Sequence, residues 1–482
     1  PKSLWLYRYR KDLAAPFSKE TEQRLNIGHN VGELAQQYFQ ERGPTVEVHA
    51  PFWDVEGGAC QTRSFLAEGE DVIFEATAAL DQAYSRIDVL RRKPYGQMEL
   101  IEVKAATKVK PYHIDDMSFQ YHVFSNAGYA IDACYMMLIN TGYTRQGPLE
   151  LDKLFQFCDV STPVRARGRK VLEASNQFSD MLGKKVEPQI EMGNHCSRPF
   201  ECVYVEYCQK LRQRPKGELF PKAVSELENI SEEGGEKKSK VPKRYQIRPD
   251  MLRRWLDALR YPLYFLDYEC CQSPLPMFDQ SRPYQVIPFQ FSLHIQPEEN
   301  AALQHVSFLY MGDEPGGERD PRKPFIHKLL EHCGSEGSIV VYNQSFEASV
   351  NRSLARDFPS YKEALFALNA RMKDMHVPFG KYWLYSPLQR GGTSLKTILP
   401  IYTSFSYEDI AMNNGLDAMN AYLAFLQGAV PEPAELRADL EEYCRLDTLA
   451  LYLLLVAIKQ ELTRKPIISS FPSSGQLLDI PH

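Results

Sequence analysis

The sequence predicts an α/β protein with two domains. Its 482 residues exceed what one ordinary hydrophobic core organises, so two or three domains are expected. Short apolar runs of strand composition alternate with segments whose apolar residues recur at helical spacing. Residues 216–247 are charged and contain Gly, Ser and Pro, which is the composition of a linker. We therefore expect one domain over residues 1–215 and another over residues 248–482.

Composition and charge narrow the class of protein. Hydrophobic residues make up 44% and charged residues 24%, as in ordinary globular proteins. The net charge of −6 argues against a protein that coats polyanions, although a local basic groove remains compatible with it. Residues 449–458 form the longest apolar run, which is too short to cross a bilayer. Without a recognisable signal peptide, we expect a cytoplasmic protein with no membrane partner.

The first domain is predicted to have the order helix, hairpin, helix, strand. Apolar residues at helical spacing indicate a helix over residues 21–43. Strand-like runs follow at residues 72–76, 85–90 and 99–103, and a polar turn joins the last two as in a hairpin. A helix over about residues 115–126 and a strand over residues 133–139 complete a small α/β unit.

The second domain begins with a short helix at residues 249–259. The apolar runs 263–269 and 287–295 read as strands, and residues 338–343 read as a buried strand that leads into a helix. A long helix over about residues 433–465 ends the pattern. The two halves of the chain do not resemble each other, so no internal repeat is expected.

Three ionisable residues of the first domain fit a metal-dependent site. Asp88 is expected to close one strand of the hairpin, and Glu102 and Lys104 share one face of the next strand, since side chains alternate. If the strands pair, Asp88 and Glu102 can bind one divalent metal, and Lys104 can orient the attacking water or stabilise charge on the phosphate. On this strand Glu102 and Lys104 lie on one face, and the apolar Ile101 and Val103 lie on the other. This pattern favours a metal site over a solvent-exposed face that carries unrelated charges.

This pattern resembles the PD-(D/E)xK nucleases, in particular the RecB-like branch that includes the CRISPR adaptation nucleases. The resemblance implies a restriction-endonuclease-like fold and Mg²⁺ or Mn²⁺. In that branch a residue of an upstream helix completes the metal site, a role that His29 or Glu33 could fill. The family also carries a Gln-x-x-x-Tyr motif on the following helix. Gln120 matches it, whereas Phe124 stands at the tyrosine position.

Three cysteines indicate a metal site after the nuclease core. Cys196, Cys202 and Cys208 are evenly spaced, and in a cytosolic-looking chain such thiolates favour a metal over disulfides. Zinc and an iron–sulfur cluster are both compatible. A fourth ligand is required, and His195 or the distant Cys60 are candidates. The other cysteines lie mostly in apolar runs and are expected to be core thiols.

The same family resemblance favours a [4Fe–4S] cluster over Zn²⁺. RecB-like nucleases with such a cluster use three cysteines after the nuclease core and one before it. In relatives that open like this chain, a cysteine directly precedes the residue corresponding to Pro1. We therefore expect the fourth ligand upstream of Pro1, and a structural role for the cluster.

A second set of acids lies in the second domain. Asp267 and Glu269 share one face at the end of a strand, and Glu347 lies near a helix N-terminus, where an anion is favoured. Tyr443 and Asp447 are four residues apart on a helix and share a face. Four carboxylates from distant segments can bind two Mg²⁺ ions. Tyr443 would then orient the water.

These residues resemble the DnaQ-like (DEDDy) 3′–5′ exonucleases of the ribonuclease H-like fold. The Asp-x-Glu pair, the string Asn343, Phe346 and Glu347, and the Tyr-x-x-x-Asp pair occur in the family's order. The second motif usually ends in Asp, and Glu347 departs from it. Asp374 and the string from Ser394 to Lys396 resemble secondary family segments and are expected to be structural.

The two resemblances together imply a metal-dependent DNA nuclease with two modules, one cutting or trimming and one removing 3′ nucleotides. An RNA 3′–5′ exonuclease is one alternative. The other is a nucleic-acid-binding subunit of a repair or defence complex with degenerate sites, which the departures at Glu347 and Phe124 would suit.

Overall fold

The computed structural model describes residues 1–80, 83–198, 200–213, 242, 244–312, 319–407, 412 and 414–463. Most of the expected linker, residues 216–241 and 243, lies outside these ranges. The chain divides into two compact units. Unit 1 comprises Pro1–Gly234 and Ser273–Gln285, and unit 2 comprises Gly235–Gln272 and Val286–His482. The segment Ser273–Gln285, expected within the second domain, therefore groups with the first unit.

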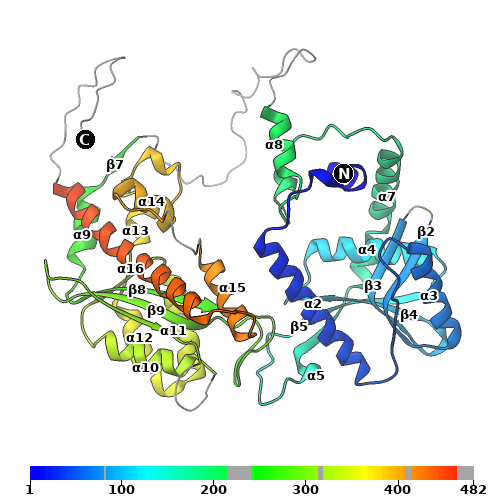
Figure 1. Cartoon of the computed structure of the whole chain (residues 1–482), viewed down its shortest axis with the longest axis horizontal. Helices are drawn as coiled ribbons and strands as arrows, with labels where there is room; N and C mark the ends of the chain where they lie inside the picture. The colour runs from blue at the N-terminus through cyan, green and yellow to red at the C-terminus, as the bar shows by residue number, and fades with distance from the viewer. Residues whose placement is uncertain are drawn as a thin grey trace, which may run out of the picture. The chain divides into compact units, whose positions relative to one another are not determined.

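Unit 1 is organised around a six-stranded mixed sheet (Figure 1). Its strands, in spatial order, are β1 (Val46–Glu47), β2 (Val72–Leu80), β3 (Ala83–Arg92), β4 (Met98–Lys104), β5 (Ile131–Ile139) and β6 (Phe155–Asp159). Neighbours β2, β3 and β4 are antiparallel, whereas β4 and β5 are parallel and joined through helix α4 (Pro111–Asn126). The expected hairpin is present, followed by the expected helix and strand.

Helices cover both faces of this sheet. Helix α2 (Lys19–Gln40) begins at the cap Ser18 and buries Val31, Ala35 and Phe39 against one face. Helix α4 packs against the other face through Met117 and Phe124. The remaining helices of the unit are α1 (Lys2–Tyr9), α3 (Val55–Glu68), α5 (Leu151–Leu154), α6 (Ser161–Ala166), α7 (Gly168–Gly183) and α8 (Val205–Gln213), with 3₁₀ turns η1 (Lys11–Leu13), η2 (Pro94–Gly96) and η3 (Asn194–Cys196).

The structure differs from the sequence expectation at three places in unit 1. Helix α4 starts at Pro111 rather than near residue 115, because proline is well suited to the first helical turn. Asp88 lies inside β3 and does not close it, since pairing with β2 continues beyond Asp88 to Arg91. Helix α3 was not anticipated, because Gly57 and Gly58 lower its helical propensity. Gly58 allows close approach to β2, since a Cβ there would lie 3.1 Å from Thr77 Oγ1.

Unit 2 contains a five-stranded sheet in the spatial order β10 (Gln304–Leu309), β9 (Ile287–Gln296), β8 (Leu263–Cys271), β11 (Ser338–Val341) and β12 (Met372–Asp374). Strands β10, β9 and β8 are antiparallel, whereas β8, β11 and β12 are parallel. A two-stranded ribbon joins β7 (Gln246–Ile247) to β13 (Leu384–Tyr385). The central strand β8 therefore belongs to both the antiparallel and the parallel halves of the sheet.

Helices also cover both faces of the second sheet, in yellow and orange-red in Figure 1. One face packs against α10 (Arg322–His332), α11 (Gln344–Asp357) and α12 (Lys362–Arg371). The other packs mainly against α16 (Pro433–Thr463), with α9 (Pro249–Asp257), α13 (His376–Gly380) and α14 (Leu395–Tyr402). Helix α15 (Gly415–Leu426) and the 3₁₀ turns η4 (Pro359–Tyr361) and η5 (Pro387–Gln389) complete the unit. Both units are thus mixed α/β, as expected.

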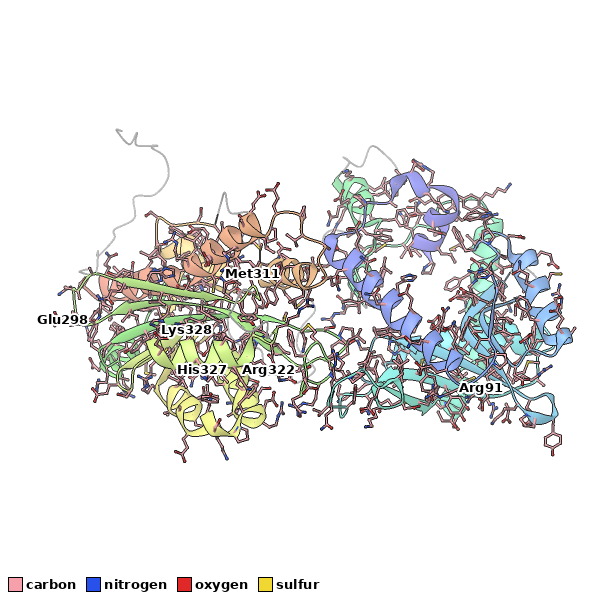
Figure 2. All side chains as sticks on the ribbon, turned by 60° about the horizontal axis from the view of Figure 1, so that its bottom comes forward. Arg91, Glu298, Met311, Arg322, His327 and Lys328 are labelled. Atoms are coloured by element: carbon pink, nitrogen blue, oxygen red, sulfur yellow. The ribbon has the colours of Figure 1, made fainter. Side chains whose placement is uncertain are left out.

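Alternation along β8 decides which side chains meet α16. Tyr264, Leu266 and Tyr268 belong to the core under α10–α12. Leu263 and Phe265 belong to the core under α16. Asp267 and Glu269 continue this second series, so both carboxylates face α16. On the opposite side, the fully buried Arg322 (Figure 2) pairs with Asp320 and Asp357 and begins α10.

None of the described helices is both long and apolar enough to pass through a bilayer.

We expect Gly337→Ala to destabilise unit 2. Gly337 precedes β11 with a φ of +83°, and a Cβ there would lie 2.1 Å from the Pro262 carbonyl oxygen. Gly428→Ala is the matched control, because Gly428 has a φ of +72° but no neighbour within 4 Å of an added Cβ. Positive φ alone costs roughly 1–2 kcal/mol, and the collision adds to that only at Gly337. Equal losses in urea-unfolding free energy for the two variants would contradict this account of the β8–β11 junction.

Candidate metal centres

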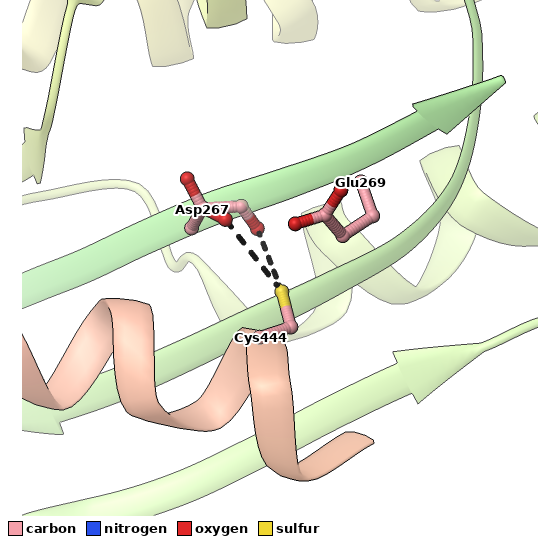
Figure 3. A group of neighbouring side chains, drawn as sticks. All are labelled: Asp267, Glu269 and Cys444. Carbon is pink, nitrogen blue, oxygen red and sulfur yellow. Dashed lines mark hydrogen bonds between the residues drawn. The ribbon is translucent and has the colours of Figure 1, made fainter. Parts of the chain in front are cut away.

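The acidic site of unit 2 is built on β8 and α16. Asp267 and Glu269 face the helix, and each has a carboxylate oxygen within 4.8 Å of the other and of Cys444 Sγ (Figure 3). The Cys444 thiol donates to Asp267 Oδ2 at 3.7 Å and approaches its carbonyl oxygen at 3.9 Å. Among the described residues, this is the one group of at least three such ligands so closely spaced.

Two further carboxylates lie within electrostatic reach of Asp267, outside the group that is spaced within 4.8 Å. Glu347 lies in the first turn of α11, and Asp447 lies on α16 one turn after Tyr443. Burial, followed by the charge of Asp267, raises the pKa of Glu347 from 4.5 to about 9. Burial and the charge of Asp447 raise the pKa of Asp267 well above its usual range. We call Asp267, Glu269, Glu347 and Asp447 the C-terminal acidic site.

This site has the chemistry of a divalent-cation site. Burial raises the pKa of Glu269, and Asp267 and Asp447 raise it further. Glu347 is only 2% exposed, and its Oε2 atom has no hydrogen-bond partner in the described part of the chain. Buried carboxylates without partners are costly, and a hard cation with oxygen ligands removes that cost. The four residues therefore fit Mg²⁺ or Mn²⁺.

Aromatic and basic side chains complete the surroundings of Asp447. The Tyr407 hydroxyl donates to Asp447 Oδ1 at 2.5 Å, and Tyr443 is a second hydrogen-bond partner. Lys396 Nζ lies 5.0 Å from the ring centroids of both Tyr407 and Tyr443, and its charge opposes the rise in the pKa of Asp447. Sequence reasoning assigned Lys396 a structural role and missed Tyr407, which lies outside helices and strands.

Asp374, also expected to be structural, holds the start of α11. Its Oδ1 atom accepts from the backbone amides of Asn343 and His376 at 3.0 and 2.9 Å. Asn343 adopts a left-handed conformation with a φ of +71°, which asparagine tolerates better than most residues. Phe346 is 39% exposed on the same turn, whereas the adjacent Glu347 is buried. The Asn-x-x-Phe-Glu string therefore forms a turn that directs Glu347 inward.

The acidic site of unit 1 joins Asp88, Glu102, Lys104 and Gln120. The register Val89↔Ile101, carried one residue further, sets Asp88 opposite Glu102. Asp88 Oδ2 accepts from the Val103 amide at 2.6 Å. Lys104 Nζ donates to Glu102 Oε1 at 2.6 Å, and Gln120 Nε2 donates to Glu102 Oε2 at 2.8 Å. We call these four residues the N-terminal acidic site.

Mutual repulsion and burial perturb these carboxyls as well. Burial, then the charge of Asp88, raises the pKa of Glu102 to about 8. Burial raises the pKa of Asp88 to about 6. For Lys104, burial alone would lower the pKa, but Glu102 and Asp116 outweigh it and raise the pKa. Asp116, which forms a 3.3 Å ion pair with Lys104, was missed although it lies four residues before Gln120 on one helix face.

A cavity of about 640 Å³ opens beside Asp88. It is lined by His29 and Glu33 from α2 and by Glu75 from β2, among others. His29 and Glu33 are exposed and pair with each other at 3.2 Å, and the structure gives neither a direct contact with Asp88. In the register of β2 and β3, Glu75 lies opposite Asp88. Its backbone φ of +54° is unfavourable for a glutamate. No sequence motif marks Glu75.

Phe124 contributes nothing to this site. It is fully buried, packs in the core beneath α4 and lies 5.3 Å from the Tyr129 ring centroid. Its packing explains why the position accepts an apolar ring in place of tyrosine. Gln120 remains, and its Oε1 atom has no hydrogen-bond partner among the described residues.

The three evenly spaced cysteines that follow the sheet of unit 1 line one cavity of about 360 Å³. Cys196, Cys202 and Cys208 share its wall with Pro1 and His195. Burial raises the pKa of Cys208, and the other two thiols add to the rise, so their charges are within electrostatic reach. All three sulfur atoms are described, yet they do not lie within 4.8 Å of one another. Cys60 is exposed on α3 and does not line this cavity.

Comparisons with known proteins match part of the chain. A family model described as a domain of unknown function (DUF2779) matches residues 264–394, a span that contains Asp267, Glu269 and Glu347 but not Asp447. An uncharacterized protein, UU173, of Ureaplasma parvum serovar 3 is 24% identical over 192 residues. That match covers 36% of this chain and 26% of the relative, so the chain spans about a quarter of the length of that protein. No solved structure matches.

We expect the metal-free chain to lose stability as pH rises. The pKa of Glu347 is 4.5 unfolded and about 9 folded, so between these values the folded state binds a proton that the unfolded state lacks. Stability therefore falls with rising pH, by at most about 1.4 kcal/mol per pH unit for this group. Glu347→Gln should therefore reduce the dependence of stability on pH. The measurement is the free energy of unfolding by urea in EDTA between about pH 5 and pH 9, the window between the two pKa values. The control Glu363→Gln changes an exposed glutamate and should keep the pH dependence of the unsubstituted chain. An unchanged pH dependence in Glu347→Gln would contradict the assignment of this effect to Glu347.

Proposed function

We propose that the chain is a metal-dependent nuclease in which unit 2 removes 3′ nucleotides from a DNA strand and unit 1 cuts or trims DNA. The observation that carries the proposal is the close pair Asp267 and Glu269 on β8, with the buried Asp447 of α16 and Glu347 of α11 within electrostatic reach of Asp267 and an unpaired oxygen on Glu347. Burying so many like charges is costly unless cations accompany them.

The C-terminal acidic site suits phosphodiester hydrolysis. Bound Mg²⁺ or Mn²⁺ would supply Lewis-acid chemistry and a water of lowered pKa. Asp267, Glu269, Glu347 and Asp447 would hold the cations. The Tyr443 hydroxyl, next to Asp447, would orient the water, and Lys396 places a positive charge beside the acids. Glu347 in place of the family's usual aspartate is accommodated, because the turn at Asn343 directs its longer side chain toward the charge of Asp267.

The architecture of unit 2 supports the resemblance to DnaQ-like exonucleases. Its mixed sheet has helices on both faces, and β8, the first of its strands along the sequence, supplies the Asp-x-Glu pair. The final helix supplies Tyr443 and Asp447. This arrangement is compatible with a ribonuclease H-like fold.

The architecture of unit 1 supports the resemblance to PD-(D/E)xK nucleases in the same way. A helix precedes the antiparallel strands β2, β3 and β4, and a helix and parallel strand follow them. Asp88, Glu102 and Lys104 meet on β3 and β4, and Gln120 reaches Glu102 from the following helix. Asp88 and Glu102 would hold a cation. Lys104, already paired with Glu102, would stabilise charge on the phosphate.

We expect degradation of end-labelled DNA to require Mg²⁺ or Mn²⁺ and to stop in EDTA. Asp267→Asn should abolish release of 3′ nucleotides, and Asp88→Asn should abolish the separate products of unit 1, each by about a hundredfold or more, since each removes a metal ligand. Glu363→Gln, an exposed acid on α12, is the matched control. An RNA strand of equal sequence tests the alternative substrate. Tight DNA binding without turnover under either metal would contradict the proposal and favour degenerate sites.

We further propose that Cys196, Cys202 and Cys208 hold a [4Fe–4S] cluster. The three thiols line one cavity, and their sulfur atoms do not all lie within 4.8 Å of one another. Tetrahedral zinc with bonds of about 2.3 Å requires sulfurs about 3.8 Å apart, whereas a cluster of several metal atoms spans a larger space. Pro1 and His195 line the same cavity.

We expect the protein to bind about four iron atoms per chain after anaerobic reconstitution. Cys202→Ser should lose the visible absorption of the cluster, because it removes one of three ligands that share the cavity. The exposed Cys60→Ser should keep it. Stoichiometric zinc with no bound iron would contradict the cluster assignment.

A further inference from the structure

A thiol lies inside the C-terminal acidic site. Cys444 is fully buried on α16, in the same turn as Tyr443 and one turn before Asp447. Sequence reasoning grouped it with core thiols, because the residues around it are compatible with a buried helix face. Its Sγ atom instead points between the carboxylates of Asp267 and Glu269 (Figure 3).

The position of Cys444 is set by two elements. Helix α16 supplies the residue, and its sulfur lies 3.7 Å from Asp267 Oδ2 and 3.9 Å from the Asp267 carbonyl oxygen. The three side chains present one sulfur and carboxylate oxygens within 4.8 Å of one another, close enough for one ion. Cys270, next to Glu269 in sequence, is not part of this group, since β8 alternates its side chains.

A second observation points to a ligand near this group. Glu347 is 2% exposed, its Oε2 atom has no hydrogen-bond partner among the described residues, and it lies within electrostatic reach of Asp267. An ion near Asp267 would meet oxygen ligands from β8 and α11 and a sulfur ligand from α16. Mg²⁺ avoids sulfur, whereas Zn²⁺ and Cd²⁺ bind thiolate readily.

We propose that Cys444 is a metal ligand that gives the C-terminal acidic site a sulfur-containing position selective for thiophilic divalent ions such as Zn²⁺ or Cd²⁺. This inference rests on the proposed function only in that both use the same carboxylates. Binding releases the thiol proton to solvent, and the ion takes its place between Sγ and the two carboxylates. Cys444 would then distinguish the thiophilic ions that occupy this position from the Mg²⁺ or Mn²⁺ that would support cleavage.

Cadmium NMR on the full chain tests the proposal, because the chemical shift separates a site with one sulfur from an all-sulfur site. The unsubstituted chain should show a resonance from one sulfur and several oxygens. That resonance should disappear in Cys444→Ser and persist in the control Cys270→Ser. Cd²⁺ affinity measured by calorimetry should fall about tenfold or more in Cys444→Ser, and Cys444→Ala, which lacks any ligand atom, should behave alike.

The outcomes separate this inference from the proposed function. An identical mixed-ligand resonance in Cys444→Ser, with native circular dichroism, overturns the inference. Cleavage by the unsubstituted chain in Mg²⁺ is measured independently. A resonance that requires both Cys444 and Asp267, in a chain that cleaves nothing, supports the metal site and rejects the nuclease. If Cys444→Ser does not fold, Cys444→Ala and the Asp267→Asn spectrum decide, since a resonance untouched by both overturns the inference.

Discussion

The cost of placing several carboxylates together in a protein interior is the constraint on which both sites depend. In unit 2, the central strand supplies Asp267 and Glu269, and two helices bring Glu347 and Asp447 within electrostatic reach of Asp267. Burial raises the pKa of all four carboxyls, and the charges of Asp267 and Asp447 raise the pKa of their neighbours further, so an ionised set needs a cation. The fold must therefore be rigid enough to hold these groups together without one.

Strand β8 provides that rigidity. Tyr264, Leu266 and Tyr268 pack under one layer of helices, and Leu263 and Phe265 pack under α16. Strand β8 pairs with β9 along Asp267 and Glu269 and with β11 over residues 263–265, so the sheet fixes the backbone that carries the two carboxylates. Helix α16 is held in turn by buried polar contacts, such as that from Gln290 Nε2 to the Leu440 carbonyl oxygen at 2.7 Å. The acids are thus positioned by packing that does not involve them.

The sequence predicts those parts of the sites that follow from local periodicity. Asp267 and Glu269 on one strand face, and Tyr443 and Asp447 on one helix face, need only alternation and helical spacing. Tyr407 and Glu75 could not be found in this way, because one lies in an irregular segment and the other acquires its place from a strained backbone. Nor does any local pattern reveal that Ser273–Gln285 packs with unit 1, where the Tyr284 hydroxyl donates to the Ala105 carbonyl oxygen at 2.6 Å.

The two sites differ in how much of their negative charge the protein itself compensates. In the N-terminal acidic site, Lys104 pairs directly with Glu102 and Asp116. In the C-terminal site, Lys396 stands over tyrosine rings and only moderates the charges of Glu269 and Asp447. Glu347 keeps an oxygen without a partner in the described chain. The second site therefore leaves more charge for a cation to balance, so metal binding should be coupled more strongly to the stability of unit 2 than to that of unit 1.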